Sequence, residues 1–310
     1  MSRNRSESAG DLAERLSEAG LDQQAVTRLV DATLEEDLAG GDDVTSAATV
    51  DDDATATATF TTRADGVVAG LDVVELVLSR AARDRVEVTH LVADGAQVSA
   101  GQPLLRARGR ARDLLLAERT ALNLVCHLSG VATLTRAWVH AVAGTGAAVR
   151  DTRKTTPLLR SLEKYAVRCG GGMNHRMSLS DAALVKDNHV LAAGGVVPAY
   201  RRVRDAHPHL EVEVEVDSLQ DALEVVQAGA DLVLLDNFDT PTLATAVRLV
   251  DGRARLEASG GLTLESAASV AATGVDYLAV GALTHSAPVL DIGLDFEPAT
   301  GVDTASARKG

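Results

Sequence analysis

Lysine is rare in this chain, and three of its four lysines lie close together. Of the 30 basic residues, only Lys154, Lys164, Lys186 and Lys309 are lysine. Lys154 and Lys186 each follow an apolar stretch typical of a strand. Lysine is a compact point charge and arginine a planar fork, so these two positions favour sites that require an ammonium. Chance clustering and a bias toward arginine codons remain the alternative, so the lysines locate a candidate site without identifying it.

Other cations accompany these lysines. Arg153 precedes Lys154, and the glycine run 170–172 leads into His175 and Arg176. Five potential cations on one rim, in a chain of net charge −14, indicate a ligand with several phosphates or carboxylates. Taken alone, His175 would be interpreted as a surface histidine. Lys164 falls inside a helical stretch, where we expect a solvated face.

Acidic residues end two other predicted strands. In 211–216 glutamate alternates with valine, so the valines should face outer helices and the glutamates the interior, with Glu215 nearest the mouth. The alternative is an exposed edge strand with a solvated acidic face. Asp236 ends the apolar run 232–235, where a carboxylate can bind a sugar hydroxyl or Mg²⁺. Its alternative role, capping a helix, could be filled by Asp239 or Thr240.

Small residues follow the last two predicted strands. Ser259, Gly260 and Gly261 follow one, and Gly281 and Ala282 the other. They allow backbone N–H groups to approach a phosphate, although ordinary turns use the same residues.

Strands and helices alternate from residue 147 onward, which predicts a parallel sheet. A dinucleotide-binding glycine motif is missing, and polar residues follow every strand, so we favour a barrel whose active site lies at the carboxyl ends of its strands. A seventh or eighth strand could be overlooked. The six predicted strands are 147–150, 182–186, 211–216, 232–235, 255–258 and 277–280.

The first third of the chain mixes a small sheet with helices. We expect a half-buried strand over 54–61, a helix over 71–83, and a hairpin of 86–92 with 97–106. A longer helix should run from 113 to about 130. The acidic stretch 42–46 looks like a diphosphate-ribose loop, but no buried strand precedes it, so we interpret it as a turn with a helix N-cap.

Composition excludes several classes of protein. The net charge of −14 disfavours nucleic acid and anionic membranes as partners. No apolar run approaches the roughly 18 residues of a membrane span, and no signal peptide opens the chain, so we expect a cytoplasmic protein. Cys126 and Cys169 lack metal-type spacing, and no disulfide is expected.

Six motifs, in this order, resemble those of the quinolinate phosphoribosyltransferases. They are Glu118–Asn123, Asp151–Thr155, Gly171–Arg176, Lys186–His189, Glu213–Asp217 and Ser259–Gly261. The resemblance covers roughly residues 20 to 296. It implies an α/β fold with an N-terminal α/β sandwich domain and an incomplete parallel α/β barrel of about seven strands.

The resemblance also implies domain boundaries, assembly and chemistry. Residues 16–130 would form the sandwich, 286–296 would return to it, 131–285 would form the barrel, and 1–15 and 297–310 would be flexible tails. The family forms homodimers with shared active sites. Its members transfer the phosphoribosyl group of phosphoribosyl diphosphate to quinolinate, with Mg²⁺, releasing diphosphate, CO₂ and nicotinate mononucleotide.

Residue roles follow from the same resemblance. Lys154 would lie beside the phosphoribosyl diphosphate, and Glu215 and Asp236 would meet the ribose hydroxyls and Mg²⁺, which makes these three the expected catalytic residues. Arg119 would come from the partner subunit. The quinolinate carboxylates would meet Arg119, Arg153, His175, Arg176 and Lys186, next to Thr152, and phosphate would meet Ser259, Gly260, Gly261, Gly281, Ala282 and His285.

Three other functions remain open from the sequence. A strand-end lysine in a barrel can form a Schiff base, so Lys186 could serve an aldolase. A barrel without catalytic activity could sense a phosphorylated metabolite. A sister phosphoribosyltransferase could use nicotinate or another acceptor, although five cations suit a dicarboxylate better.

Overall fold

The computed structural model describes residues 9–298, and the chain divides into two compact units that are interleaved in sequence. Within the described residues, the first unit comprises 9–133, 161–169 and 287–298, and the second comprises Leu134–Arg160 and Gly170–Ser286. The resemblance implied that 161–169 belongs to the barrel, and in the structure this segment groups with the first unit. Within the described residues, no helix is both long and apolar enough to cross a membrane.

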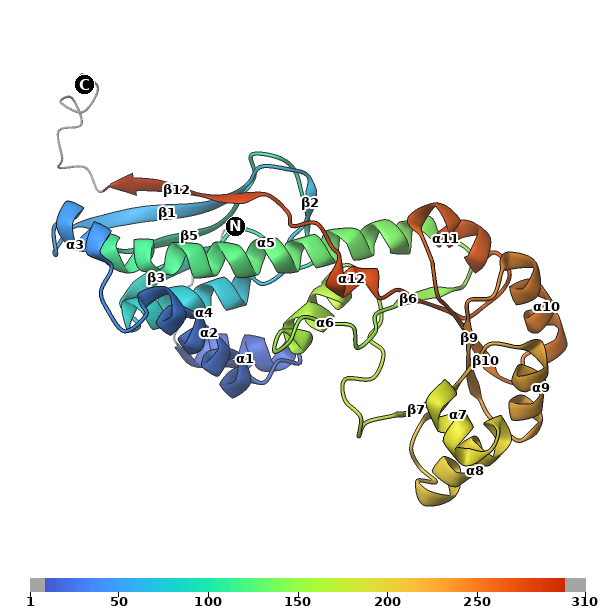
Figure 1. Ribbon diagram of the computed structural model, residues 1–310. Helices are drawn as coiled ribbons and strands as arrows, with labels where there is room; N and C mark the ends of the chain where they lie inside the picture. The colour runs from blue at the N-terminus through green and yellow to red at the C-terminus, as the bar shows by residue number, and fades with distance from the viewer. Residues whose placement is uncertain (1–8, 299–310) are drawn as a thin grey trace. The chain divides into compact units, whose positions relative to one another are not determined.

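A four-stranded antiparallel sheet, in the order β12-β1-β5-β3, forms the centre of the first unit (Figure 1). Its strands are β1 (Thr55–Thr62), β3 (Val86–His90), β5 (Pro103–Arg110) and β12 (Ile292–Pro298), beside the small pair β2 (Gly66–Val67) and β4 (Gln97–Val98). The helices are α1 (Ala9–Glu18), α2 (Gln23–Leu38), α3 (Val44–Thr49), α4 (Leu71–Ala82) and nearly all of α6 (Arg160–Cys169).

The alternation of threonine and alanine in β1 has the predicted effect. Ala56, Ala58 and Phe60 are at most 1% exposed, and the intervening threonines Thr57 and Thr59 are half-buried on the opposite face. The strand therefore places its small and apolar side chains in the core, because successive strand residues point to opposite faces.

The predicted hairpin of 86–92 with 97–106 is confirmed in part. β3 pairs antiparallel with the start of β5, with His90 opposite Leu105 and Thr89 opposite Arg106, whereas β4 pairs with β2. The chain between β3 and β5 leaves the sheet because Gly95 donates its backbone N–H to the carbonyl of Val68 at 2.8 Å and Gly101 donates to Thr62 at 2.7 Å. Asp43 does cap α3, accepting the backbone N–H groups of Thr45 and Ser46.

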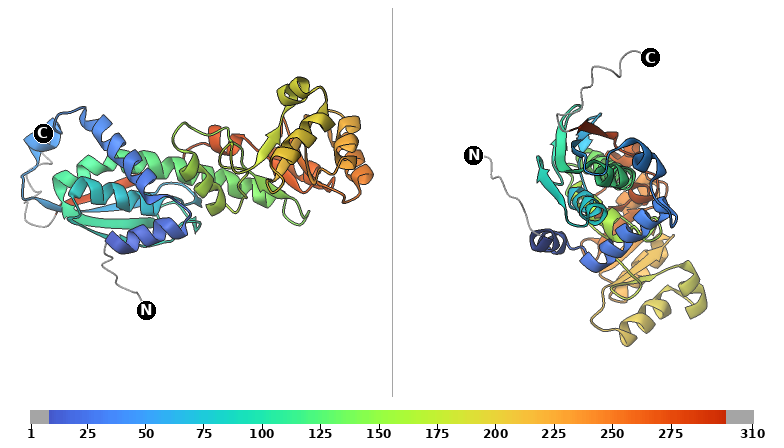
Figure 2. Two further views of the ribbon diagram at one scale, coloured as in Figure 1. Left: turned by 90° about the horizontal axis from the view of Figure 1, so that it is seen from below. Right: turned by 90° about the vertical axis from the view of Figure 1, so that its left-hand side faces the viewer.

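A six-stranded parallel sheet, in the order β6-β11-β10-β9-β8-β7, forms the second unit. Its strands are β6 (Ala148–Arg150), β7 (Ala183–Val185), β8 (Val212–Val216), β9 (Leu232–Asp236), β10 (Arg255–Ser259) and β11 (Tyr277–Ala279). Its helices are α7 (Asp187–Ala193), α8 (Val196–Ala206), α9 (Leu219–Gln227), α10 (Thr240–Val250), α11 (Leu264–Ala271) and α12 (Ala282–His285). The yellow and orange helices of Figure 2 lie outside these strands. The α/β class and the parallel sheet are as predicted.

The sheet has six strands where the family resemblance implied about seven. At the free edge of β6, Met173 forms an isolated parallel bridge with Arg150. Its N–H donates to the carbonyl of Val149 at 2.8 Å, and its carbonyl accepts the N–H of Asp151 at 3.1 Å. This short segment contacts the sheet where a further strand would lie, and it leads directly into His175 and Arg176. Helix α5 (Ala111–Ala141) begins in the first unit, ends in the second, and is longer than predicted.

Candidate active site

A cavity of about 400 Å³ lies at the carboxyl ends of the parallel strands. Every residue that lines it belongs to the second unit. They are Thr152, Arg153, Lys154, His175, Arg176, Leu184, Lys186, Glu215, Leu234, Asp236, Glu257, Ser259 and Ala279. The five cations and two carboxylates expected from the sequence therefore share one cavity, as parallel strands with polar carboxyl ends predict.

Two guanidinium groups converge on one side of this cavity. Burial, and then the charge of Arg153, lower the pKa of Arg176 below its usual value. Arg176 donates one hydrogen bond, from Nη1 to the carbonyl of Ala182 at 3.0 Å, whereas Nε of Arg153 is buried without a hydrogen-bond partner among the described residues. The two guanidinium groups repel each other, and some of their N–H donors have no partner in the described structure. An anion with two charged groups would accept these donors and neutralise both charges.

Lys154 is held through its backbone. Its N–H donates to the Thr152 hydroxyl at 3.0 Å, and its carbonyl accepts the Thr284 hydroxyl at 2.8 Å. In the part of the chain that the structure describes, no carboxylate pairs with its ammonium. A fixed backbone and an unpaired charge leave this side chain available to an anionic ligand.

Glu215 and Asp236 lie on adjacent strands, β8 and β9. The Glu215 side chain is 16% exposed and forms an ion pair with Lys186. Asp236 accepts a hydrogen bond from the Asn237 amide at 2.7 Å. Helix α10 is capped by Asp239, which accepts the N–H of Thr242, so Asp236 is not needed as the cap. Glutamates of β8 do face the interior, and the exposed-edge alternative is excluded because β8 pairs on both sides.

The small residues after β10 and β11 are structurally constrained. Gly260 has φ +89°, and a Cβ there would lie 2.1 Å from Oδ1 of Asn237. A Cβ on Gly281 would lie 3.0 Å from Cδ of Lys154 and 3.3 Å from Nε2 of His285. Gly260 therefore requires glycine, and Gly281 leaves little room for a side chain beside Lys154. Gly261 follows Gly260 directly, and Ala282 and His285 are the first and last residues of α12.

A layer of buried charged side chains adjoins the cavity and includes residues that the sequence analysis missed, and one of them, Glu257, also lines the cavity. Arg150 is 8% exposed and donates from Nη1 to Glu257 at 2.7 Å, and Glu257 is fully buried. Burial and the neighbouring charge of Glu213 raise the pKa of Glu257 to about 7, and the charge of Arg150 opposes this shift. Glu257 lies two residues before Ser259 on β10, as Glu213 lies two residues before Glu215 on β8. Residues two apart on a strand point to the same face, so this spacing could have identified Glu257 from the sequence.

This layer predicts a pH-dependent stability. Because the pKa of Glu257 is raised in the folded protein, its favourable contribution is complete below the unfolded value of 4.5 and is lost as pH rises through about 7. The free energy of unfolding, measured with urea, should therefore fall between pH 5 and 8 by about 2 kcal/mol less in Glu257→Gln than in the wild type. Glu36→Gln, at an exposed position of α2, should follow the wild type. Parallel pH profiles for Glu257→Gln and wild type would contradict the prediction.

His175 lines the cavity, and its ring is also held by neighbouring groups of the protein. It is 9% exposed, and its Nε2 lies 2.6 Å from Oε2 of Glu213. Its Nδ1 accepts the backbone N–H of Arg176 at 2.7 Å. Both ring nitrogens are therefore engaged within the protein. Arg119, the remaining expected contact, lies exposed on α5 in the first unit.

Lys164 contradicts its predicted solvated face, because its side chain is fully buried in α6. Cys126 and Cys169 are free thiols, as expected. Burial is the main cause that raises the pKa of the Cys169 thiol to about 12, which makes it a poor nucleophile.

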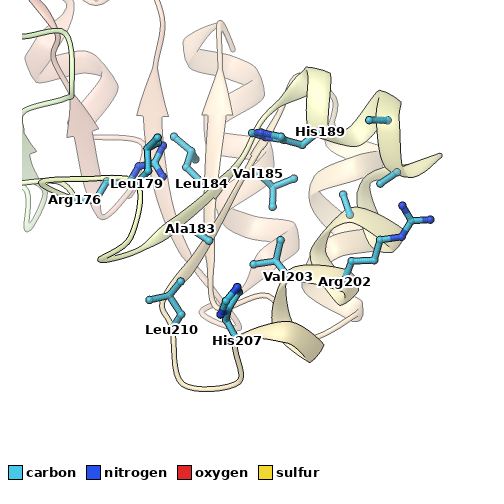
Figure 3. A pocket seen from close by; sticks show the side chains of 13 residues that line it. Arg176, Leu179, Ala183, Leu184, Val185, His189, Arg202, Val203, His207 and Leu210 are labelled. Carbon is cyan, nitrogen blue, oxygen red and sulfur yellow. The ribbon is translucent and has the colours of Figure 1, made fainter.

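A second cavity, of about 460 Å³, lies between β7 and helices α7 and α8. Figure 3 shows Val185 and Val203 facing this space, with His207 and Leu210 at one end. No carboxylate lines it, and most of its lining is aliphatic. Although it is the larger of the two cavities, it lacks the mixture of acids and bases that catalysis requires.

Two groups of described residues could offer three ligand atoms to a metal ion. One is His175 with Glu213 and Glu257, where Arg150 already supplies a positive charge. The other is Asp72, Glu75 and His90 in the first unit, where Arg15 pairs with both carboxylates at 2.7 and 2.5 Å. Neither group contains Glu215 or Asp236.

Two family models match successive parts of the chain, with a boundary near residue 130. Residues 43–129 match the family model of the quinolinate phosphoribosyl transferase N-terminal domain, and residues 131–295 match that of the C-terminal domain. The chain is 56% identical over 266 residues to the nicotinate-nucleotide pyrophosphorylase [carboxylating] of Mycobacterium leprae, covering 84% of this chain and 94% of that protein.

Two further comparisons agree with these matches. The chain is 40% identical over 234 residues to a probable nicotinate-nucleotide pyrophosphorylase [carboxylating] of Bacillus subtilis, covering 75% of this chain and 81% of that one. The crystal structure of NadC from Streptococcus pyogenes superimposes with a TM-score of 0.86 at 38% identity, covering 90% of this chain and 99% of that one.

Proposed function

This chain belongs to the quinolinate phosphoribosyltransferase family, and on that premise we propose that its rim cavity joins quinolinate to phosphoribosyl diphosphate. The products are nicotinate mononucleotide, diphosphate and CO₂, so the enzyme is a phosphoribosyltransferase of NAD biosynthesis. The observation that carries the proposal is the pair Arg153 and Arg176, two guanidiniums with unused donors in one cavity. Two adjacent carboxylates on a small ring match that pair.

The other residues of the cavity suit the second substrate. Lys154 would contact the departing diphosphate, and the backbone at Gly260, Gly261 and Gly281 would approach phosphate oxygens, with Ser259, Ala282 and His285 beside them. Glu215 and Asp236 would lie against the ribose. Their negative charge stabilises the positive charge that develops on the anomeric carbon as its bond to diphosphate breaks.

The chemical sequence needs no covalent enzyme intermediate. The quinolinate ring nitrogen attacks the anomeric carbon, and diphosphate leaves with the bonding electrons. The ring nitrogen is then cationic, so it can accept the electrons of the adjacent carbon–carboxylate bond. CO₂ departs and a proton replaces it on the ring. The protein's part is to position both substrates and to balance charge.

The carboxylates of the cavity could supply some of the ligands of a Mg²⁺ ion. Mg²⁺ is usually held by one or two carboxylates together with substrate phosphates. Asp236 is bonded only through Oδ2 to Asn237, whereas Glu215 is paired with Lys186. We infer that Asp236 would hold the ion with the diphosphate oxygens, with Glu215 joining it when Lys186 turns to the substrate. When bound, the ion would neutralise charge on the diphosphate.

A shared active site follows from the same proposal. The described lining residues all come from the second unit, whereas Arg119 belongs to the first. The family resemblance assigns this contact to Arg119 of the partner subunit, so we propose a homodimer with shared active sites. We expect this dimer in the cytoplasm, with no nucleic acid or membrane partner.

The aldolase alternative is less well supported. A Schiff-base lysine needs a neutral amine in a desolvated site, whereas the Lys186 side chain is 45% exposed and ion-paired with Glu215. The acceptor alternative, a nicotinate enzyme, would leave one of the two guanidiniums without a carboxylate.

One assay tests the proposed function. Purified protein with phosphoribosyl diphosphate and Mg²⁺ should release diphosphate and CO₂ in equal amounts with quinolinate, and neither product above background with nicotinate. Equal diphosphate release with nicotinate would identify a sister enzyme. Release of neither product with either acceptor would leave the metabolite-sensing alternative.

A further inference from the structure

Four buried titratable side chains contact one another at the cavity and have no assigned part in the chemistry proposed above. Glu213 and Glu257 are at most 1% exposed, Arg150 and His175 are less than a tenth exposed, and His175 and Glu257 also line the cavity. Burying charge is costly unless each group is paired. A buried group of this kind, next to substrate-binding residues, calls for a role in the geometry of the site.

The hydrogen bonds of His175 fix its tautomer. The backbone N–H of Arg176 points at Nδ1 over 2.7 Å, and an amide N–H can only donate. Nδ1 must therefore accept, and it carries no proton. The ring proton is on Nε2, which donates to Oε2 of Glu213 at 2.6 Å. His175 is accordingly a neutral imidazole.

The contact with Arg176 depends on this tautomer. A proton on Nδ1 would set two N–H donors against each other and break the contact. Oε1 of Glu257 lies 3.7 Å from Nε2, so two carboxylates are near the Nε2 proton. While the 173–176 segment keeps this conformation, Nε2 is the nitrogen that carries the proton.

The same segment is held on its other side by a buried aspartate. Asp151 is fully buried and accepts the N–H of His175 at 2.8 Å and the side-chain amide of Asn174 at 2.6 Å. The chain entering Arg176 is therefore fixed between β6, through Asp151, and β8, through the ring of His175 and Glu213. Arg176 follows without an intervening residue.

We propose that Glu213 and His175 are positioning residues: His175, as its neutral Nε2–H tautomer accepted by Glu213, orients the backbone of Arg176 for its substrate carboxylate. Only the contact between Arg176 and quinolinate rests on the proposed function. The tautomer and its acceptor rest on the structure alone.

Nitrogen NMR of the wild-type enzyme without substrate tests the tautomer. With ¹⁵N-labelled histidine, the His175 ring should show one protonated and one unprotonated nitrogen, with the proton on Nε2, from pH 6 to 8. The signal is assigned by its loss in His175→Asn. Two protonated nitrogens, or a proton on Nδ1, would overturn the proposal whether or not the enzyme uses quinolinate.

Kinetics of two Glu213 variants test the positioning role. Glu213→Gln keeps a carbonyl acceptor for Nε2–H, so its KM for quinolinate should stay within about threefold of wild type. Glu213→Ala removes the acceptor and should raise this KM about tenfold, as one lost hydrogen bond to a charged group does, with less effect on the KM for phosphoribosyl diphosphate. Circular dichroism and thermal melting report whether each variant is folded.

Two kinetic outcomes would contradict the proposal. If folded Glu213→Ala keeps the wild-type KM for quinolinate, Glu213 does not position the site. If Glu213→Gln is impaired as much as Glu213→Ala, the negative charge matters more than the acceptor, as it would beside an imidazolium. Wild-type enzyme that does not turn over quinolinate would refute the proposed function instead, and the NMR result would still decide the tautomer.

Discussion

Replacing Arg153 by alanine is expected to lower kcat/KM for quinolinate about a thousandfold, because the substrate loses a charge-assisted bidentate contact. Nε of Arg153 is buried without a partner, so nothing in the described protein competes for this guanidinium. The KM for phosphoribosyl diphosphate should change only a few-fold. Arg153→Lys should recover part of the loss, since it restores the charge without the planar fork. Steady-state assays that vary each substrate separately measure all three effects.

Arg202→Ala provides the matched control. Arg202 is exposed on α8 and lines the second, mostly aliphatic cavity. Its removal should leave both kinetic constants within about twofold of wild type, as is usual for exposed residues that do not contact substrate. A loss of activity in Arg202→Ala together with normal kinetics in Arg153→Ala would move the active site to that second cavity.

A mixture of two inactive variants should regain activity if the active site is shared between subunits. Arg119→Ala and Lys154→Ala should each lower kcat/KM by about a thousandfold. Unfolding and refolding an equimolar mixture should restore about a quarter of the wild-type specific activity, because half of the dimers are hybrids and each hybrid has one intact site of two.

The control for this experiment pairs Arg153→Ala with Lys154→Ala. Both residues line the same cavity, so no hybrid dimer of these two variants contains an intact site. Recovery in this control, or no recovery with Arg119→Ala, would show that Arg119 does not act on the partner subunit's cavity. Size-exclusion chromatography should verify that the refolded mixtures are dimeric.

The sequence was informative where residue spacing maps directly onto a parallel sheet. Alternation in 211–216 predicted that Glu213 and Glu215 would face the interior, and both do, with Glu215 the more exposed. Asp239 was recognised as a possible helix cap, which left Asp236 for another role. Polar residues after each strand meet in one cavity because parallel strands end at one edge.

Other features depend on contacts that spacing does not encode. The tautomer of His175 is set by the next residue's amide and by a glutamate on β8. Lys164 lies in an amphipathic-looking helix, yet its polar side is buried as well. The pairing of β4 with β2 depends on turns tied to distant backbone carbonyls. Contacts between residues that are distant in the sequence cannot be predicted from the local sequence pattern.

Nearly all of helix α6 belongs to the first unit, although the chain before and after it belongs to the second. This limits where the enzyme can be divided. The cavity-lining segments 152–154 and 175–176 stand on either side of this helix in sequence, and its Leu162, Ala166 and Val167 are fully buried. A gene fragment that encodes only the barrel would still carry those apolar side chains, without the core that covers them. Cutting the chain at residue 134 would separate α6 and β12 from the rest of the first unit, so we expect neither piece to fold on its own.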